Sequence, residues 1–279
     1  MSVDKLIDSA QLESDLTDVA DAIRAKTGGT ADLQFPADFV SEIGSISGGG
    51  EWTSDGLANL SEPSGAITLS VTSIGANAFT GKTALTSISG ASVTNIGTSA
   101  LSYCTNLAKI DFPEVTTFGT TVCQYSTALV DVNLPKLTTA GNSGNYTFRN
   151  CSHLVGLVLP SYTGVFGQGF FEGCSALTYI DVLGGSFGSF GGNKANFNLL
   201  IVRKTASVAS LSSINGFNNT PFANDGTGGT LYVPSALISS YQSATNWSTI
   251  LGYANNSIEA IEGSQYENYY ADGTPIPTT

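Results

Sequence analysis

The stretch Val93–Pro113 reads VTNIGTSALSYCTNLAKIDFP, and variants of it recur along much of this chain of 279 residues. The copies open at Val71, Val93, Val115, Leu137, Tyr162 and Ser186. The first three spacings are 22 residues, and the next two are 25 and 24. A period of this length indicates a solenoid, because a single repeat cannot bury its apolar residues and must stack on its neighbours.

Two segments of each repeat alternate apolar and polar residues, as half-buried strands do. In the quoted copy they are Val93–Gly97 and Leu107–Phe112. We expect the glycine that ends the first segment to adopt a positive φ, and Pro113 to end the second strand. We expect the segment between them to form one turn of helix, with an inward residue in each of four copies: Phe79, Leu101, Phe148 and Phe171. Equivalent strands should then stack in parallel, about 4.8 Å apart.

The regions outside the repeats divide the chain further. Residues 1–46 predict a small helical module for attachment and oligomerisation, whose apolar positions are Leu12, Leu16, Val19, Ile23, Phe39 and Ile43. Residues 47–50 form a Gly-rich linker, residues 51–192 the solenoid, 193–262 a capping module and 263–279 a tail. In the capping module we expect strands at 199–204 and 230–234, and a helix that Ser235 caps.

Charge and composition exclude several classes of partner. Lys and Arg number 10 against 22 Asp and Glu, which gives a formal net charge of −12. This charge repels nucleic acids and anionic lipid headgroups, so neither is an expected partner. No apolar run is long enough to span a bilayer, so membrane insertion is not expected. The N-terminal residues MSVDKLIDSAQLESDL lack the basic and apolar regions of a secretory signal, which favours synthesis and folding in the cytoplasm.

The cysteines and the single histidine do not predict a metal site, a cofactor or a catalytic centre. Cys104, Cys151 and Cys174 occupy the same repeat position, which favours a buried structural thiol over a metal or disulfide ladder. His153 lies two residues after Cys151, but that thiol belongs to the core pattern, so we expect no nucleophile–base pair there. The sequence therefore predicts a protein that is not an enzyme.

Polar side chains that alternate with the core positions of the second strand predict a candidate binding surface. Its residues are Lys109, Asp111, Asp131, Asn133, Tyr179 and Asp181. An aromatic ring beside hydrogen-bonding groups suits a glycan. We expect Asp111 and Asp131 to approach each other across adjacent repeats, as the paired acids of a glycoside hydrolase do. Nothing in the sequence distinguishes either one as the proton donor, so a solvated charged face is favoured over catalysis.

The repeat V-T-x-I-G-x-x-A-F-x-x-C-x-x-L-x-x-I-x-L-P resembles the BspA-like leucine-rich repeat from Val71 to about Gly185. Lys82 replaces the cysteine in the first copy and Ser126 replaces it in the third, and the fourth copy carries an insertion at Asn142–Asn145. Residues Gly228–Ser248 are similar to a module that often follows such repeats. Residues Leu6–Thr30 and Phe35–Val40 resemble a module at the start of tail and fibre-like proteins of bacteriophages. The fold predicted is a mainly β leucine-rich-repeat solenoid with a helical N-terminal module and a C-terminal cap.

These resemblances imply a phage tail or baseplate fibre-type protein that recognises a bacterial surface receptor, either a glycan or a protein. Its N-terminal module would bind other virion proteins, and the chain would act as a homo-oligomer located in the virion. The first alternative is a BspA-like adhesin on the bacterial cell surface. The second is a depolymerase of surface polysaccharide that uses Asp111 and Asp131.

Overall fold

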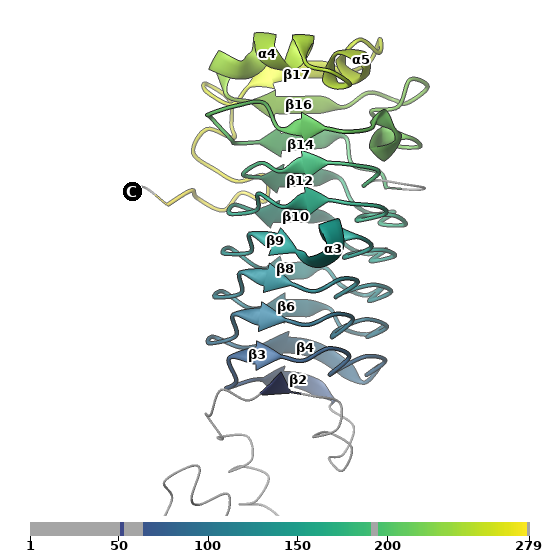
Figure 1. The fold of residues 1–279 in the computed structure, drawn as a ribbon, viewed down its shortest axis with the longest axis vertical. Coiled ribbons are helices and arrows are strands. Elements are labelled where there is room, and N and C mark those ends of the chain that lie inside the picture. Colours follow the sequence, from purple (N-terminus) through teal and green to yellow (C-terminus); the bar gives the residue numbers. More distant parts are fainter. Residues whose placement is uncertain (1–50, 53–63, 191–194, 278–279) are drawn as a thin grey trace, which may run out of the picture.

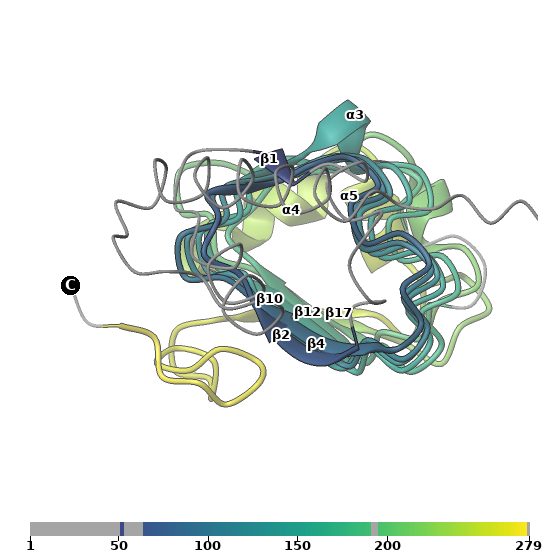
Figure 2. The same ribbon diagram turned by 90° about the horizontal axis from the view of Figure 1, so that it is seen from below.

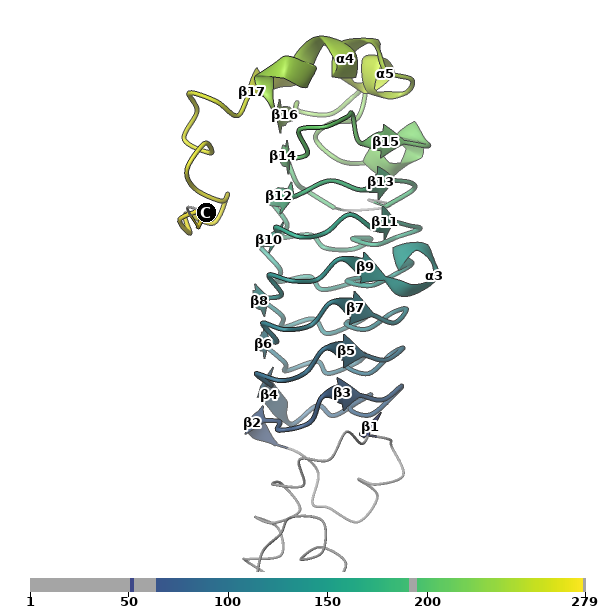
Figure 3. The ribbon, with the colours of Figure 1, turned by 60° about the vertical axis from the view of Figure 1, so that its left-hand side comes forward.

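The chain forms an elongated coil of stacked turns in which parallel sheets line two sides (Figures 1 and 3). This structure, a computed structural model, describes residues 51–52, 64–190 and 195–277. The predicted N-terminal module and linker, residues 1–50, therefore lie outside the described residues, as do Leu12, Leu16, Val19, Ile23, Phe39 and Ile43. The mainly β solenoid predicted from the repeat is confirmed.

One side of the coil carries two-residue strands, and those after β1 lie at the V-T-x-I-G position of successive turns. They are β1 (Glu51–Trp52), β3 (Ser73–Ile74), β5 (Asn95–Ile96), β7 (Thr117–Phe118) and β9 (Thr139–Ala140), followed by a separate sheet of β11 (Val165–Phe166), β13 (Ser186–Phe187) and β15 (Ser210–Leu211). Each pairs in parallel with the next, for example Asn95 with Thr117. We refer to this as the β1–β15 side.

The opposite side carries the longer strands. They are β2 (Gly65–Thr68), β4 (Leu85–Ser89), β6 (Lys109–Asp111) and β8 (Asp131–Asn133), followed by β10 (Gly156–Leu159), β12 (Tyr179–Val182), β14 (Leu199–Val202), β16 (Thr230–Val233) and β17 (Ser257–Ala260). We refer to this as the β2–β17 side. Both sides are interrupted at the copy with the insertion, where α3 (Gly141–Gly144) projects from the coil (Figure 2).

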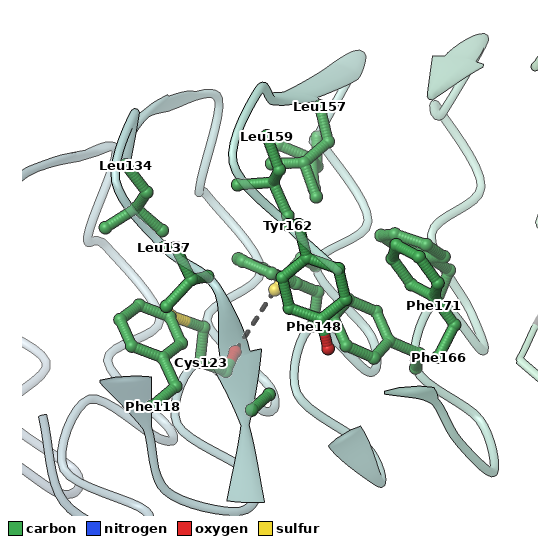
Figure 4. Packing of buried hydrophobic residues seen from close by; sticks show 14 of the residues in the cluster. Phe118, Cys123, Leu134, Leu137, Phe148, Leu157, Leu159, Tyr162, Phe166 and Phe171 are labelled. Atoms are coloured by element: carbon green, nitrogen blue, oxygen red, sulfur yellow. Dashed lines mark hydrogen bonds between the residues drawn. The ribbon is translucent and has the colours of Figure 1, made fainter. Parts of the chain in front are cut away.

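The interior of the coil is filled by apolar side chains, and those from equivalent repeat positions stack on one another along the coil axis. Phe79, Leu101, Phe148 and Phe171 are all buried, which confirms their predicted orientation. Toward the C-terminal half the stack becomes aromatic. The ring of Phe148 lies 6.3 Å from that of Phe171 (Figure 4). Phe166 stacks on Phe187 with 4.8 Å between the ring centres. Each turn therefore completes the core of the next, as the repeat pattern requires.

The predicted helical turn between the two strands is wrong. The structure instead has two tight corners per repeat, each at a residue with positive φ. The second corner is occupied in successive copies by Gly81, Tyr103, Tyr125, Asn150 and Gly173. The backbone N–H of Tyr103 donates to the carbonyl of Gln124 in the next turn at 2.8 Å. Because these N–H groups pair between turns of the coil, they are not available for hydrogen bonds within a helix.

The glycine that ends each V-T-x-I-G segment is not there for the positive φ that the sequence predicted. Gly97 and Gly119 do not have positive φ. A Cβ atom on Gly97 would lie 2.5 Å from the amide nitrogen of Ala76 and 2.8 Å from the carbonyl carbon of Gly75. Glycine is therefore required here because the backbones of successive turns nearly touch.

The solenoid does not end at residue 192, because β14, β16 and β17 extend the β2–β17 side without a break. Its end is covered by η2 (Ser235–Leu237), α4 (Ile238–Ser243) and α5 (Trp247–Leu251), while η1 (Ile214–Phe217) lies in an earlier loop (Figure 1). The indole Nε1 of Trp247 donates to the Ala209 carbonyl at 2.7 Å, which ties the cap to the coil.

Ser235 is not the helix cap that the sequence predicted. Pro234 occupies the N-cap position of η2, and no side chain makes a capping hydrogen bond there. The backbone N–H of Ser235 instead donates to the carboxylate of Glu262 at 2.7 Å. No helix within the described ranges is both long and apolar enough to cross a membrane.

Candidate binding surface

The exposed polar residues of β6 and β8 pair across the sheet. Strand register places Lys109 beside Asp131 and Asp111 beside Asn133. The Lys109 ammonium donates to the Asp131 carboxylate at 2.7 Å, and the Asn133 amide donates to Asp111 at 2.7 Å. Lys109 and Asp131 keep about half of their side-chain area exposed, 46% and 52%. These four candidate residues therefore form one accessible patch, which we call the β6–β8 patch.

The same register does not place Asp111 directly opposite Asp131, because each faces a different partner on the adjacent strand. Asp131 is exposed and Asp111 is half-buried, so neither carboxylate is enclosed in an apolar pocket. The arrangement suits hydrogen bonding to a ligand better than it suits paired acid–base chemistry.

Tyr179 and Asp181 are placed differently from the other four candidates. The Tyr179 ring lies over Gly156 on the neighbouring strand, where a Cβ atom would collide with it. Asp181 is fully buried, so it is not an exposed residue of the predicted face. The reason is the C-terminal segment 263–277, which folds back along the outside of the β2–β17 side (Figures 2 and 3). We call this segment the strap.

Arg203 joins Asp181 to the strap. Its guanidinium donates to both carboxylate oxygens of Asp181 at 2.7 Å. The same group donates to the backbone carbonyls of Tyr266 at 2.8 Å and Tyr269 at 3.0 Å, and the Ala271 N–H donates to Asp181 at 2.9 Å. Burial raises the pKa of Asp181 above its ordinary value, although Arg203 and the Ala271 N–H oppose that shift. Asp181 is therefore a structural residue that holds the strap.

Sequence reasoning missed Arg203 and the strap, although one signal was present. The strand segment Leu199–Val202 is apolar at every position, whereas a half-buried strand alternates. Ile201 points away from the core, in register with Asp181 and Tyr232, and is nevertheless fully buried. A continuous apolar run of this kind indicates that both faces of the strand are covered.

A shallow groove lies between the strap and the solenoid. It has a volume of about 130 Å³ and is lined from the coil by Val132, Asn133, Leu134, Pro135, Val158 and Pro160, and from the strap by Tyr270, Asp272 and Thr274. Asn133 belongs both to this groove and to the β6–β8 patch. The accessible candidate surface is thus the patch together with the groove beside it.

At the repeated cysteine position, the side chain donates a hydrogen bond to a backbone carbonyl of the preceding turn. The thiols of Cys104, Cys151 and Cys174 donate to the carbonyls of Phe79, Cys123 and Phe148 at 3.0, 3.1 and 3.0 Å. Figure 4 draws the bond to the Cys123 carbonyl. Ser126 replaces cysteine in its copy and donates to the Leu101 carbonyl at 2.6 Å. In these four copies the position holds a small side chain that donates to the preceding turn, whereas the first copy has Lys82 there.

This predicts that Ser126→Ala destabilises the protein by about 1–2 kcal/mol, because it removes a buried hydrogen bond. Ser126→Cys should cost less than about 1 kcal/mol, since the thiol preserves the donor. Urea unfolding under reducing conditions measures both. Equal losses in the two variants would show that the position selects for size and not for a donor.

The cysteines are unsuited to nucleophilic chemistry. All four are free and buried. Burial raises the pKa of Cys104 to about 11 and that of Cys174 to about 12, and it also raises the pKa of Cys151 well above its ordinary value. His153 Nδ1 lies 2.7 Å from the Thr127 carbonyl, to which it can only donate. Among the described residues, no cluster of three or more His, Cys, Asp or Glu side chains could hold a metal ion.

None of the curated proteins matches the chain. The structure is similar to the leucine-rich-repeat protein TpLRR of T. pallidum, at 22% identity and a TM-score of 0.46, over 55% of this chain and 75% of that one. It is also similar to a leucine-rich cell surface protein of Faecalibacterium prausnitzii A2-165, at 14% identity and a TM-score of 0.22, over 77% of this chain and 83% of that one.

The repeat itself is matched by a family model. Residues 59–178 match, in six copies, the model described as BspA type leucine-rich repeat region. The match covers less than half of the chain and, among the described residues, includes strands β2 to β11 and the corners between them. This part of the coil is therefore similar to leucine-rich repeats of the BspA type.

Proposed function

We propose that this chain is a non-catalytic recognition protein, an adhesin of the BspA-like kind that acts at a bacterial cell surface. The observation that carries the proposal is the run of six BspA-type repeats at residues 59–178. The core positions of these repeats are needed for stacking, whereas the outward positions are not. The outward positions can therefore carry side chains that bind a receptor.

The β6–β8 patch and the adjoining groove are the proposed contact surface. Lys109, Asp111, Asp131 and Asn133 offer donors and acceptors of both charge signs on a rigid sheet. Rigid polar groups bind a receptor with little loss of conformational freedom. A receptor with hydroxyl, amide or mixed charged groups, either a glycan or a protein, suits this surface.

The test is binding of the labelled full-length chain to a panel of intact bacterial and epithelial cells. We expect saturable binding to a subset of them, reduced about tenfold or more by the double variant Asp111→Lys/Asp131→Lys. Glu114→Lys is the matched control, because Glu114 is also ion-paired and exposed but lies outside the patch. Absence of saturable binding to every cell type would refute the recognition proposal. Equal binding by all variants would refute only the assignment of the surface.

A role in a phage virion stays a prediction carried by the N-terminal sequence. The residues that resemble a tail-fibre module, Leu6–Thr30 and Phe35–Val40, lie outside the described residues. The predicted homo-oligomer formation and the predicted binding to other virion proteins are assigned to the same segment. Sedimentation analysis of the full chain beside a chain that begins at Glu51 would test whether residues 1–50 drive association.

A further inference from the structure

Two tyrosines on the corner of the coil form a stacked pair outside the β6–β8 patch. Tyr103 and Tyr125 occupy equivalent positions in adjacent turns, and their rings lie 4.8 Å apart with an angle of 12° between them. Tyr103 is 47% exposed, a high value for so large a side chain in this protein. One face of its ring packs on Tyr125, so the other face is directed toward the preceding turn.

That preceding turn leaves the space beside Tyr103 open. The equivalent residue there is Gly81, whose N–H donates to Ser102 as the Tyr103 N–H donates to Gln124. A Cβ atom on Gly81 would have nothing within 4 Å. Among the residues that the structure describes, no side chain fills the corner position of the turn that precedes the exposed ring of Tyr103.

The other end of the pair is closed. The Arg149 guanidinium lies 5.9 Å from the Tyr125 ring centre and 5.0 Å from that of Tyr146. Arg149 is also ion-paired with Glu172 at 3.1 Å. A flat ligand therefore has access to the stack at the Tyr103 end.

The backbone at this corner does not favour tyrosine. Tyr103 and Tyr125 have φ of 59° and 62°, whereas glycine occupies the same corner at Gly81 and Gly173. A bulky residue in the left-handed region is strained, and strain of this kind clusters at sites of binding. The two rings are therefore retained at a position where backbone preference alone would select Gly or Asn.

We propose that the open face of Tyr103 binds the ring of a neutral sugar, which stacks in the position a third tyrosine of the column would take. The ring face is negative, and it attracts the weakly positive C–H groups on one side of a pyranose. Thr105 and Asn106 follow Tyr103 in the same loop and are exposed, so they can hydrogen-bond to the hydroxyls of the sugar.

This inference rests on the proposed function, because it names a ligand class for surface recognition. The probes are methyl β-glucopyranoside, methyl β-galactopyranoside and methyl N-acetyl-β-glucosaminide, tested on the full chain by saturation-transfer NMR. We expect at least one of them to bind in the millimolar range through the protons of a single ring face. Tyr103→Asn should reduce affinity about tenfold or more while leaving the thermal midpoint unchanged or higher, since Asn tolerates positive φ.

Two further variants make the test specific. Gly81→Tyr should abolish the signal, because the new ring would extend the column and occupy the open face. Tyr269→Asn is the matched control, because it removes a tyrosine of similar exposure from the strap. Binding that is absent for all three glycosides, or that survives Tyr103→Asn, or that is lost only in Tyr269→Asn, would overturn the inference. If cell binding persists in those cases, the proposed function survives without it.

Discussion

Replacing Arg203 with alanine is expected to release the strap and to destabilise the protein by about 3–5 kcal/mol. The Arg203 side chain is 12% exposed and that of Asp181 is 1% exposed, so the change leaves a buried carboxylate without its counter-ion. It also removes the donors to the Tyr266 and Tyr269 carbonyls. Denaturant unfolding measures the stability, and hydrogen exchange of residues 263–277 measures release of the strap.

Lys136→Ala is the control for this prediction. Lys136 makes an ion pair of the same length, 2.7 Å, with Glu114, but the two side chains are 56% and 44% exposed. Its loss should cost less than about 1 kcal/mol, because exposed pairs are well solvated. If Arg203→Ala proved as mild as Lys136→Ala, or if exchange in the strap did not change, the strap would not depend on this clamp. Release of the strap would also widen the groove beside Asn133 and so alter the proposed contact surface.

Gly97→Ala is expected to destabilise the protein by about 3 kcal/mol, at the upper end of the range for overpacking. The added methyl group would meet the backbone of Ala76 and Gly75, which cannot move aside as a side chain can. The turns would have to separate, and the hydrogen bond from the Gly97 N–H to the Ile74 carbonyl, now 2.7 Å, would lengthen. Urea unfolding of the purified variant measures the loss.

The control for Gly97→Ala is Gly81→Ala, which separates close approach from backbone conformation. Gly81 has a φ of 72°, but a methyl group there would meet nothing within 4 Å. Its substitution should cost about 1–2 kcal/mol from left-handed strain alone. An effect of Gly81→Ala as large as that of Gly97→Ala would mean that φ, and not contact between turns, limits these positions.

The repeat period and its apolar positions were enough to predict the coil, its parallel strands and its inward residues. Phe79, Leu101, Phe148 and Phe171 could be assigned to the core because each repeats a position whose neighbours are also apolar. The candidate patch followed from the same alternation, since Lys109 and Asp111 flank the inward Ile110. Such patterns are local, and they are repeated often enough to be read without coordinates.

Other features depend on contacts that the repeat pattern does not encode. The corners carry no helix, because their N–H groups reach carbonyls about 22 residues away, as Tyr103 reaches Gln124. Gly97, which follows β5, is required because the backbones of two successive turns approach closely there. That approach depends on two repeats together and is not evident from one. Asp181 shares its repeat position with exposed residues and differs from them only because Arg203 and the strap cover it.

The sequence by itself thus determined the solenoid, the residues that fill it and the face on which a ligand would be sought. The tertiary structure decided which part of that face is accessible, through bonds between Arg203 and carbonyls 63 and 66 residues further along the chain. It also decided that Tyr103 and Tyr125 stack beside an open position. The physical reason is that the core depends on a pattern repeated in every turn, whereas these contacts arise once, between particular side chains that only folding brings together.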